Sequence, residues 1–179
     1  MNRIASIRLI LLTALLFFFS GNTMLAAKAM PEFALSSASD DSIVSSKDLQ
    51  GKVLLVTFFA TWCPPCRQEI PDFIELQKIL GDKGFSIVGI SVDEGGSEIV
   101  KKMVEMEEIN YPVLMADESV IKGFGGISGV PTSFLINRKG SVVKSYPGYA
   151  PRETVEKDIK ELLPQKSSDS ADPEHGNLG

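Results

Sequence analysis

Cys63 and Cys66 are the residues of this chain whose type and spacing most clearly suggest chemistry. They are its two cysteines, and they stand in the run Trp62-Cys63-Pro64-Pro65-Cys66. Thiols separated by two residues lie within one helical turn, which is close enough to form a small disulfide ring. Such a pair can exchange disulfides with another protein by thiolate attack. The spacing therefore predicts a redox-active Cys63–Cys66 disulfide.

The dithiol lies between a predicted strand and a predicted helix. Residues 53–59 form a nearly continuous apolar and β-branched run, typical of a strand buried on both faces. Residues 63–80 carry apolar side chains at helical spacing. The N-terminus of a helix carries free N–H groups and a partial positive charge, and both favour the Cys63 thiolate over the thiol. We therefore expect Cys63 to attack substrate disulfides and Cys66 to resolve the mixed disulfide.

Two other roles for the pair stay open at this point. A metal site normally needs four ligands, and the chain adds one histidine, His175, in its C-terminal tail. We accordingly expect no metal and no cofactor. A purely structural disulfide is the second alternative, but a ring with two intervening residues restrains the unfolded chain little. Disulfide exchange is the preferred interpretation.

The rest of the chain predicts an α/β domain around this unit. Strand, helix and strand in succession indicate a right-handed crossover. Apolar periodicity and turn signals predict the remaining elements. These are strands at 85–92, 111–115, 134–136 and 141–143, and helices at 97–108, 119–124 and 152–163.

The two ends differ from this domain in composition. Arg3 and Arg8 precede an apolar run at 9–19 and an Ala-x-Ala site that ends at Ala29. This pattern predicts a signal peptide over 1–29, with an uncleaved anchor as the alternative. We expect the folded domain over 30–164 and a Ser- and Asp-rich disordered tail over 165–179. The protein is therefore expected to be periplasmic or otherwise extracytoplasmic.

Charge and composition narrow the choice of partners. The formal net charge is −5, and no basic cluster is present that would neutralise phosphates. Nucleic acid is therefore not an expected partner. We expect a monomer.

Two motifs make the chain resemble the thioredoxin superfamily. The run from Val56 to Cys66 resembles the active-site strand and loop of thioredoxins, and Gly129-Val130-Pro131-Thr132 resembles their cis-proline loop. The export signal, the segment inserted between Gly95 and Tyr111 and the Arg67-to-Pro71 continuation are similar to the TlpA/ResA branch. The resemblance implies a thioredoxin fold, with a central mixed β-sheet flanked by helices and a TlpA/ResA-type insertion.

The resemblance also implies a function and its partners. It points to an extracytoplasmic thiol–disulfide oxidoreductase, often one that keeps thiols reduced for cytochrome c maturation. Its expected partners are protein substrates that contain disulfides and a membrane thiol reductant as electron donor. We expect the protein to act as a reductant of protein disulfides, although exported relatives include oxidants as well and the sequence does not settle the direction.

The resemblance further implies roles for individual residues. Cys63 matches the attacking thiol and Cys66 the resolving thiol. Pro131 matches the cis-proline beside the dithiol, where Val130 can pair with an extended substrate, although a trans turn proline is the alternative. Trp62 is expected to pack beside the dithiol and limit its access to solvent.

One departure from cytosolic thioredoxins concerns the proton acceptor. Thr57 replaces their buried aspartate, and a hydroxyl cannot take up a proton at neutral pH. The resemblance to the TlpA/ResA branch implies a glutamate near the dithiol, after the next strand, where Glu94 is the best match and Asp93 the next. Partial burial would let such a carboxylate accept the Cys66 proton. The alternative is that both acids cap a loop in solvent. Glu69 is expected to point to solvent.

Two other functions fit the same fold. A peroxiredoxin-like peroxidase usually has Pro-x-x-x-Thr-x-x before its cysteine, and Val56 and Ala60 occupy those positions here. A redox-silent metal- or partner-binding module would use paired cysteines with a distant histidine or methionine set. The chain offers Met103, Met106 and Met115, but no histidine in the domain.

Overall fold

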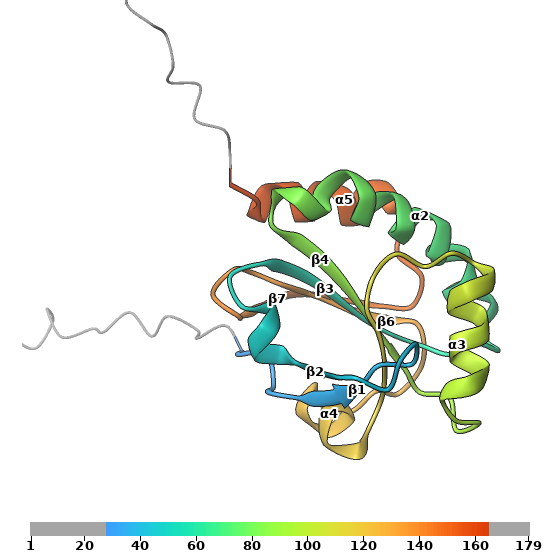
Figure 1. Cartoon of the computed structure of the whole chain (residues 1–179). Helices are drawn as coiled ribbons and strands as arrows, with labels where there is room; N and C mark the ends of the chain where they lie inside the picture. Colours follow the sequence, from blue (N-terminus) through green and yellow to red (C-terminus); the bar gives the residue numbers. More distant parts are fainter. Residues whose placement is uncertain (1–27, 165–179) are drawn as a thin grey trace, which may run out of the picture.

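The computed structural model of this protein describes residues 28–164 (Figure 1). The predicted signal peptide or anchor and the predicted tail lie outside these residues, except for Lys28 and Ala29. The Lys28 carbonyl accepts a hydrogen bond from the Val142 N–H at 2.8 Å, and Ala29 forms a bridge to Ser141. The segment next to the predicted cleavage site therefore contacts the sheet edge.

A mixed five-stranded sheet forms the centre of the domain. Its strand order is β5-β4-β3-β6-β7, with β3, β4 and β5 parallel to one another, β6 antiparallel to β3, and β7 antiparallel to β6. The strands are β3 (Val53–Phe59), β4 (Phe85–Ser91), β5 (Val113–Met115), β6 (Thr132–Ile136) and β7 (Val142–Pro147). All residues of β3 and β4 are buried, and for β3 the continuous apolar run predicted this.

Two hydrophobic cores lie on the two faces of this sheet. Along β3, Leu55 and Phe59 contribute to one core, and Leu54, Val56 and Phe58 to the other. This alternation follows from the two-residue period of a strand. The dithiol belongs to the first core, so its surroundings are set by the helices on that face.

The helices form the outer layers. The long α2 (Pro64–Leu80) and α5 (Arg152–Leu162) lie side by side over one face, while α4 (Glu118–Gly123) lies on the other (Figure 1). A small hairpin of β1 (Ala34–Ser36) and β2 (Ile43–Ser45) also covers the second face. The short 3₁₀ turns η1 (Ser46–Leu49) and η2 (Gly81–Lys83) lead into β3 and β4.

The expected insertion contains α3 (Ser97–Met106), which lies at one end of the molecule, beside the start of α2 (Figure 1). Val100 and Met103 anchor α3 in the first core. The predicted thioredoxin fold with its inserted helix is thus confirmed. Within residues 28–164, no helix is long and apolar enough to span a membrane.

Candidate active site

A disulfide joins Cys63 and Cys66 at the start of α2, with their Cα atoms 5.3 Å apart. Cys63 is the N-cap, and Pro64 and Pro65 occupy the first helical positions, where their missing N–H groups cost no helical hydrogen bond. The Cys66 N–H is therefore the first backbone donor of the helix, and it donates to Cys63 Sγ at 3.3 Å. After reduction this N–H and the helix dipole both favour a Cys63 thiolate.

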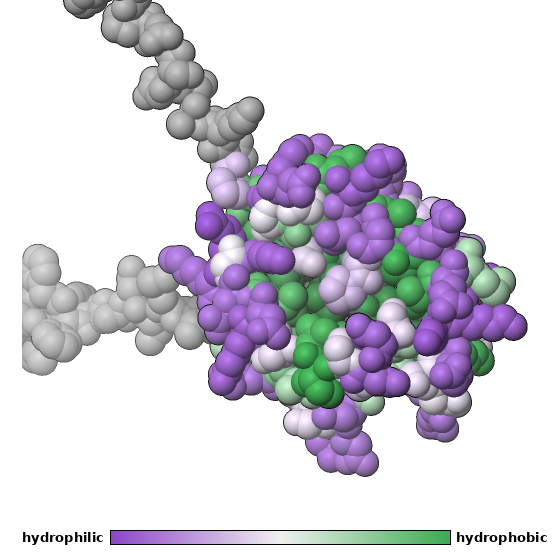
Figure 2. Space-filling view, viewed as in Figure 1, coloured by the Kyte–Doolittle hydropathy of each residue, from purple (hydrophilic) through white to green (hydrophobic). Residues whose placement is uncertain are grey.

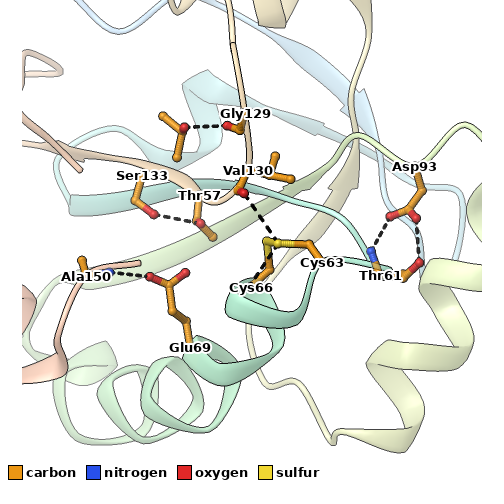
Figure 3. Close-up of a disulfide and its surroundings, with 11 residues drawn as sticks. Thr57, Thr61, Cys63, Cys66, Glu69, Asp93, Gly129, Val130, Ser133 and Ala150 are labelled. Carbon is orange, nitrogen blue, oxygen red and sulfur yellow. Dashed lines mark hydrogen bonds between the residues drawn. A yellow bond between two sulfur atoms is a disulfide. The ribbon is translucent and has the colours of Figure 1, made fainter. Parts of the chain in front are cut away.

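The loop before β6 lies against the same sulfur. The Val130–Pro131 peptide bond is cis, as the resemblance implied. The Val130 carbonyl oxygen lies 3.6 Å from Cys63 Sγ. The Pro131 carbonyl accepts from the Gly148 N–H at 2.8 Å, and the Gly129 carbonyl from the Thr132 hydroxyl at 2.7 Å. These bonds hold Val130 beside the dithiol (Figure 3).

Trp62 is exposed, whereas the two cysteines beside it in the chain are buried. Its side chain is 69% exposed, whereas Cys63 and Cys66 are each 3% exposed. The indole therefore extends into solvent from the loop between β3 and α2. Its exposure leaves it free to contact a partner rather than cover the sulfurs.

The acids after β4 do not supply a free buried carboxylate. Glu94 is exposed, so the partial burial expected of it is wrong. Asp93 is half-buried, and its oxygens accept from the Thr61 N–H at 2.9 Å, the Thr61 hydroxyl at 2.6 Å and the Ser91 hydroxyl at 2.7 Å. Asp93 therefore binds the loop that leads into the dithiol.

Glu69 is the buried carboxylate of the site, contrary to the expectation that it points to solvent. Its side chain is 2% exposed, and one oxygen accepts from the Ala150 N–H at 2.9 Å. The pKa of Glu69 is raised to about 7, chiefly by burial and also by the nearby Asp72 carboxylate, while the hydrogen bond from Ala150 opposes the shift. Glu69 and Asp93 lie on opposite sides of the disulfide in Figure 3.

A very small cavity separates this carboxylate from the resolving cysteine. Glu69 and Cys66 line it together with Thr57 and Tyr111, and its volume of about 10 Å³ is at the lower limit for one water molecule. Burial and the Glu69 carboxylate raise the pKa of Tyr111, so this phenol stays neutral. The dithiol is therefore bordered by one group that can ionise near neutral pH.

Helical spacing is the sequence signal that could have revealed Glu69. The buried residues of α2 form one stripe, and Glu69 is three residues after Cys66 and four before Phe73. A charged residue within an apolar stripe indicates a buried charge that needs a partner. Its partner is 81 residues away in sequence, at Ala150.

Thr57 takes a structural role at the position of the missing aspartate. It pairs with Ser133 across β3 and β6, and the Ser133 hydroxyl donates to the Thr57 hydroxyl at 2.9 Å. Both side chains are buried. The pair satisfies two polar groups within the sheet, next to the cavity.

The arrangement of the two cysteines at the start of α2 suits thiol–disulfide exchange. Within residues 28–164, no group of three His, Cys, Asp or Glu residues could hold a metal ion.

A family model described as Redoxin matches residues 25–163. The chain belongs to the Redoxin family.

Relatives of known sequence and structure agree with this membership in the Redoxin family. "Thiol-disulfide oxidoreductase ResA" of Bacillus thuringiensis (strain Al Hakam) is 33% identical over 148 residues, which cover 83% of this chain and 84% of the relative. The crystal structure of a thioredoxin-family thiol:disulfide interchange protein from Chlorobium tepidum TLS is 39% identical, with a TM-score of 0.71. The match covers 76% of this chain and 96% of that one.

A second Chlorobium tepidum structure has a title that calls it a putative thiol:disulfide interchange protein DsbE. It is 29% identical with a TM-score of 0.70, and the match covers 76% of this chain and 96% of that one. This Redoxin-family chain is accordingly a TlpA/ResA-like thiol–disulfide oxidoreductase of the thioredoxin superfamily. Its family implies protein disulfides as substrates.

Proposed function

We propose that the protein reduces disulfides of proteins outside the cytoplasm, with Cys63 attacking, Cys66 resolving and Glu69 accepting the proton of Cys66. The observation that carries this assignment is the buried Glu69 carboxylate, which lines the same small cavity as Cys66 and has its pKa raised to about 7. A general base needs a pKa near the working pH. Glu69 therefore takes the role that Glu94 was expected to fill.

The proposed reaction has two steps. The Cys63 thiolate attacks one sulfur of the substrate disulfide, which forms a mixed disulfide and releases one substrate thiolate. Cys66 then transfers its proton to Glu69, and its thiolate attacks Cys63 Sγ. The second substrate thiolate leaves, and the Cys63–Cys66 disulfide seen here remains. Two electrons pass to the substrate, and a thiol reductant must supply two for the next cycle.

The substrate is proposed to approach over Val130, Pro131 and Trp62. Val130 is half-buried with its carbonyl oxygen near Cys63 Sγ, and Trp62 is exposed on the loop before Cys63. An extended substrate segment can pair with backbone groups of the Val130 loop. Its cysteine would then reach Cys63 from the side not covered by α2.

The reducing direction is proposed from the similarity to ResA proteins, and a reduction potential tests it. Equilibration of the Cys63–Cys66 pair with dithiothreitol buffers should give a value nearer to thioredoxin, about −270 mV, than to DsbA, about −120 mV. Insulin reduction in the presence of dithiothreitol should accompany it. A potential near that of DsbA would reverse the assignment to an oxidant.

The location and the electron donor form a separate part of the proposal. Export is supported by the charged start, the short apolar run and the Ala-x-Ala site. From the family resemblance we add a membrane thiol reductant as electron donor and cytochrome c maturation as one use. Fractionation of cells that express the full chain, followed by mass spectrometry, should find the protein outside the cytoplasm. A mature N-terminus near residue 30 indicates cleavage, an intact N-terminus indicates an anchor, and a cytoplasmic protein contradicts export. Sedimentation should show a monomer.

The peroxidase alternative is not favoured by the geometry. Val56 and Ala60, at the positions of the peroxidase Pro and Thr, are fully buried and carry no hydroxyl. Neither side chain can bind a peroxide oxygen.

A further inference from the structure

Three large apolar side chains are exposed around one hollow beside the dithiol. Trp62 and Met106 are each 69% exposed and Ile99 is 48% exposed. They line the hollow together with Met103, and its volume is about 340 Å³. The other exposed large hydrophobic residues of the described chain are Ile43, Val143 and Tyr149, which do not line it. Exposed apolar groups gathered in one place mark contact surfaces more often than scattered ones do.

The hollow is built by the inserted helix and the start of α2. Ile99, Met103 and Met106 follow one another along α3 at spacings of four and three residues, so they share a face. The Arg67 guanidinium forms an ion pair with Glu107 at 3.2 Å, which ties the first turn of α2 to the end of α3. Figure 2 shows hydrophobic surface beside α3, among hydrophilic side chains.

The hollow is continuous with the reactive site. Thr61 and Trp62 line it and directly precede Cys63 in the chain. A substrate cysteine bonded to Cys63 therefore has its sequence neighbours within reach of the hollow, since each extended residue spans about 3.3 to 3.6 Å. A side chain of one flanking segment can enter the hollow, whose volume suits one or two large side chains.

The charged residues that line the hollow favour a substrate segment with negative charge. Arg67 and Glu107 neutralise each other, and Lys102 is exposed with no ion pair among residues 28–164. One positive charge thus remains at an otherwise apolar wall. An acidic residue beside the entering apolar side chain would be attracted, and a basic one repelled.

We propose that this hollow is a specificity subsite for protein substrates, which takes a large apolar side chain close in sequence to the cysteine that bonds to Cys63. An acidic neighbour of that side chain is preferred over a basic one. The inference rests on the proposed function, because it assumes a protein disulfide attacked by Cys63. Methionine side chains suit such a subsite because they adapt to different apolar shapes.

The test uses reduced full-length protein and peptides that each contain one cysteine, blocked as a mixed disulfide with thionitrobenzoate. Cys63 attacks the peptide sulfur and releases the coloured thionitrobenzoate thiolate, and Cys66 then releases the peptide thiol. Paired peptides carry Leu or Ser at each of three positions on either side of the cysteine. At the best position, the second-order rate constant for thionitrobenzoate release in a single turnover should be about tenfold higher for Leu than for Ser, a difference of about 1.4 kcal/mol.

Two variants assign this preference to the hollow. Ile99→Gln and Met106→Gln should reduce the Leu preference to about twofold and leave the Ser peptides unchanged. Gln keeps a high helix propensity, so α3 should remain intact. Ile43→Gln is the matched control, because Ile43 is 65% exposed on the distant β2, and it should keep the full preference. Lys102→Ala should abolish a salt-sensitive preference for Glu over Lys next to the Leu.

The outcomes separate the subsite from the proposed function. If the wild type reduces insulin but shows no Leu preference, the subsite proposal is wrong and the proposed function stands. Equal losses on Leu and Ser peptides in the α3 variants overturn it too, because they indicate damage to the dithiol. A dimer that Met106→Gln dissociates would assign the hollow to a second copy of the chain and also overturns it. Failure to reduce any peptide or insulin overturns the proposed function instead.

Discussion

Glu69 is a buried carboxyl whose own acid–base behaviour is changed by its surroundings. Water around a carboxylate stabilises its charge, and removal of this water raises the pKa. At neutral pH Glu69 is therefore divided between its two forms, with the raised pKa of about 7.

Glu69→Gln should slow the resolving step and spare the first attack. Gln keeps the size and the acceptor for the Ala150 N–H but cannot take up the Cys66 proton. A lost general base typically costs about 10²–10⁴-fold. In the wild type, the resolving rate should rise with pH through about 7, as the Glu69 carboxylate forms. Stopped-flow kinetics with a small disulfide across pH separates the two steps.

Glu94→Gln is the matched control for this experiment, since it removes the same charge from an exposed position. It should leave both steps unchanged. A slowed resolving step in Glu94→Gln with a normal one in Glu69→Gln would return the role to Glu94.

Cys66→Ala should accumulate mixed disulfides, because Cys63 can still attack but nothing resolves the product. Cys63→Ala should form none. Non-reducing gels and mass spectrometry after incubation with a disulfide-containing protein detect the trapped species. Trapping by Cys63→Ala instead would exchange the roles of the two cysteines.

At the scale of elements, Asp93 joins the end of β4 to the loop that begins α2. It accepts two hydrogen bonds from Thr61 and one from Ser91, so the dithiol loop is held from the neighbouring strand. Hydrogen bonds to charged groups contribute more than neutral ones. The position of Cys63 thus depends on a side chain outside its own strand and helix.

Asp93→Ala should lower the free energy of unfolding by about 2 kcal/mol, because the half-buried Thr61 N–H loses its acceptor. It should also broaden the distribution of loop conformations before Cys63. Urea unfolding of the oxidised protein measures the loss. Glu94→Ala, one residue further along in solvent, should change stability by less than about 0.5 kcal/mol, and an equal loss there would contradict the role of Asp93.

The contact between β3 and β6 contains a second polar link, the Thr57–Ser133 pair. Thr57→Val should cost about 1–3 kcal/mol, because the buried Ser133 hydroxyl loses its acceptor. The double variant with Ser133→Ala removes both partners and should regain most of that loss. Urea unfolding of the four proteins forms a double-mutant cycle, and additive losses would show that the hydroxyls are not coupled.

At the scale of the whole molecule, the buried Glu69 makes stability depend on pH. The folded protein holds this proton up to pH about 7, whereas an ordinary glutamate loses it above 4.5. The folded state therefore binds more protons between these values, and stability falls as pH rises through this range. The contribution of Glu69 is complete below pH 4.5 and lost above about 7.

The difference in unfolding free energy between wild type and Glu69→Gln measures this contribution. The difference, wild type minus variant, should decrease by about 3 kcal/mol from pH 4.5 to pH 7.5. Subtraction of the variant removes the titration of all other groups. Urea unfolding of the oxidised proteins at several pH values measures it. A flat result for Glu69→Gln would contradict the raised pKa.

The sequence by itself determined the elements and the chemistry that local patterns encode. The apolar run of β3, the helical period of α2 and the Cys63–Cys66 spacing each depend on residues close together in the chain. The strand–helix unit and the disulfide were therefore predicted correctly. The loop of Val130 and Pro131 followed from the family resemblance, which covers contacts that no local pattern reveals.

Only the tertiary structure decided which carboxylate is buried beside the dithiol. Glu69 is buried because α2 packs on the sheet and the segment before α5 brings the Ala150 N–H to it, and these contacts join residues distant in sequence. Asp93 accepts hydrogen bonds from Thr61, which lies 32 residues earlier in the chain. Trp62 is exposed because no element covers its loop. Burial is a property of the packed chain, so the pKa of Glu69 and the exposure of Trp62 could not be read from local sequence.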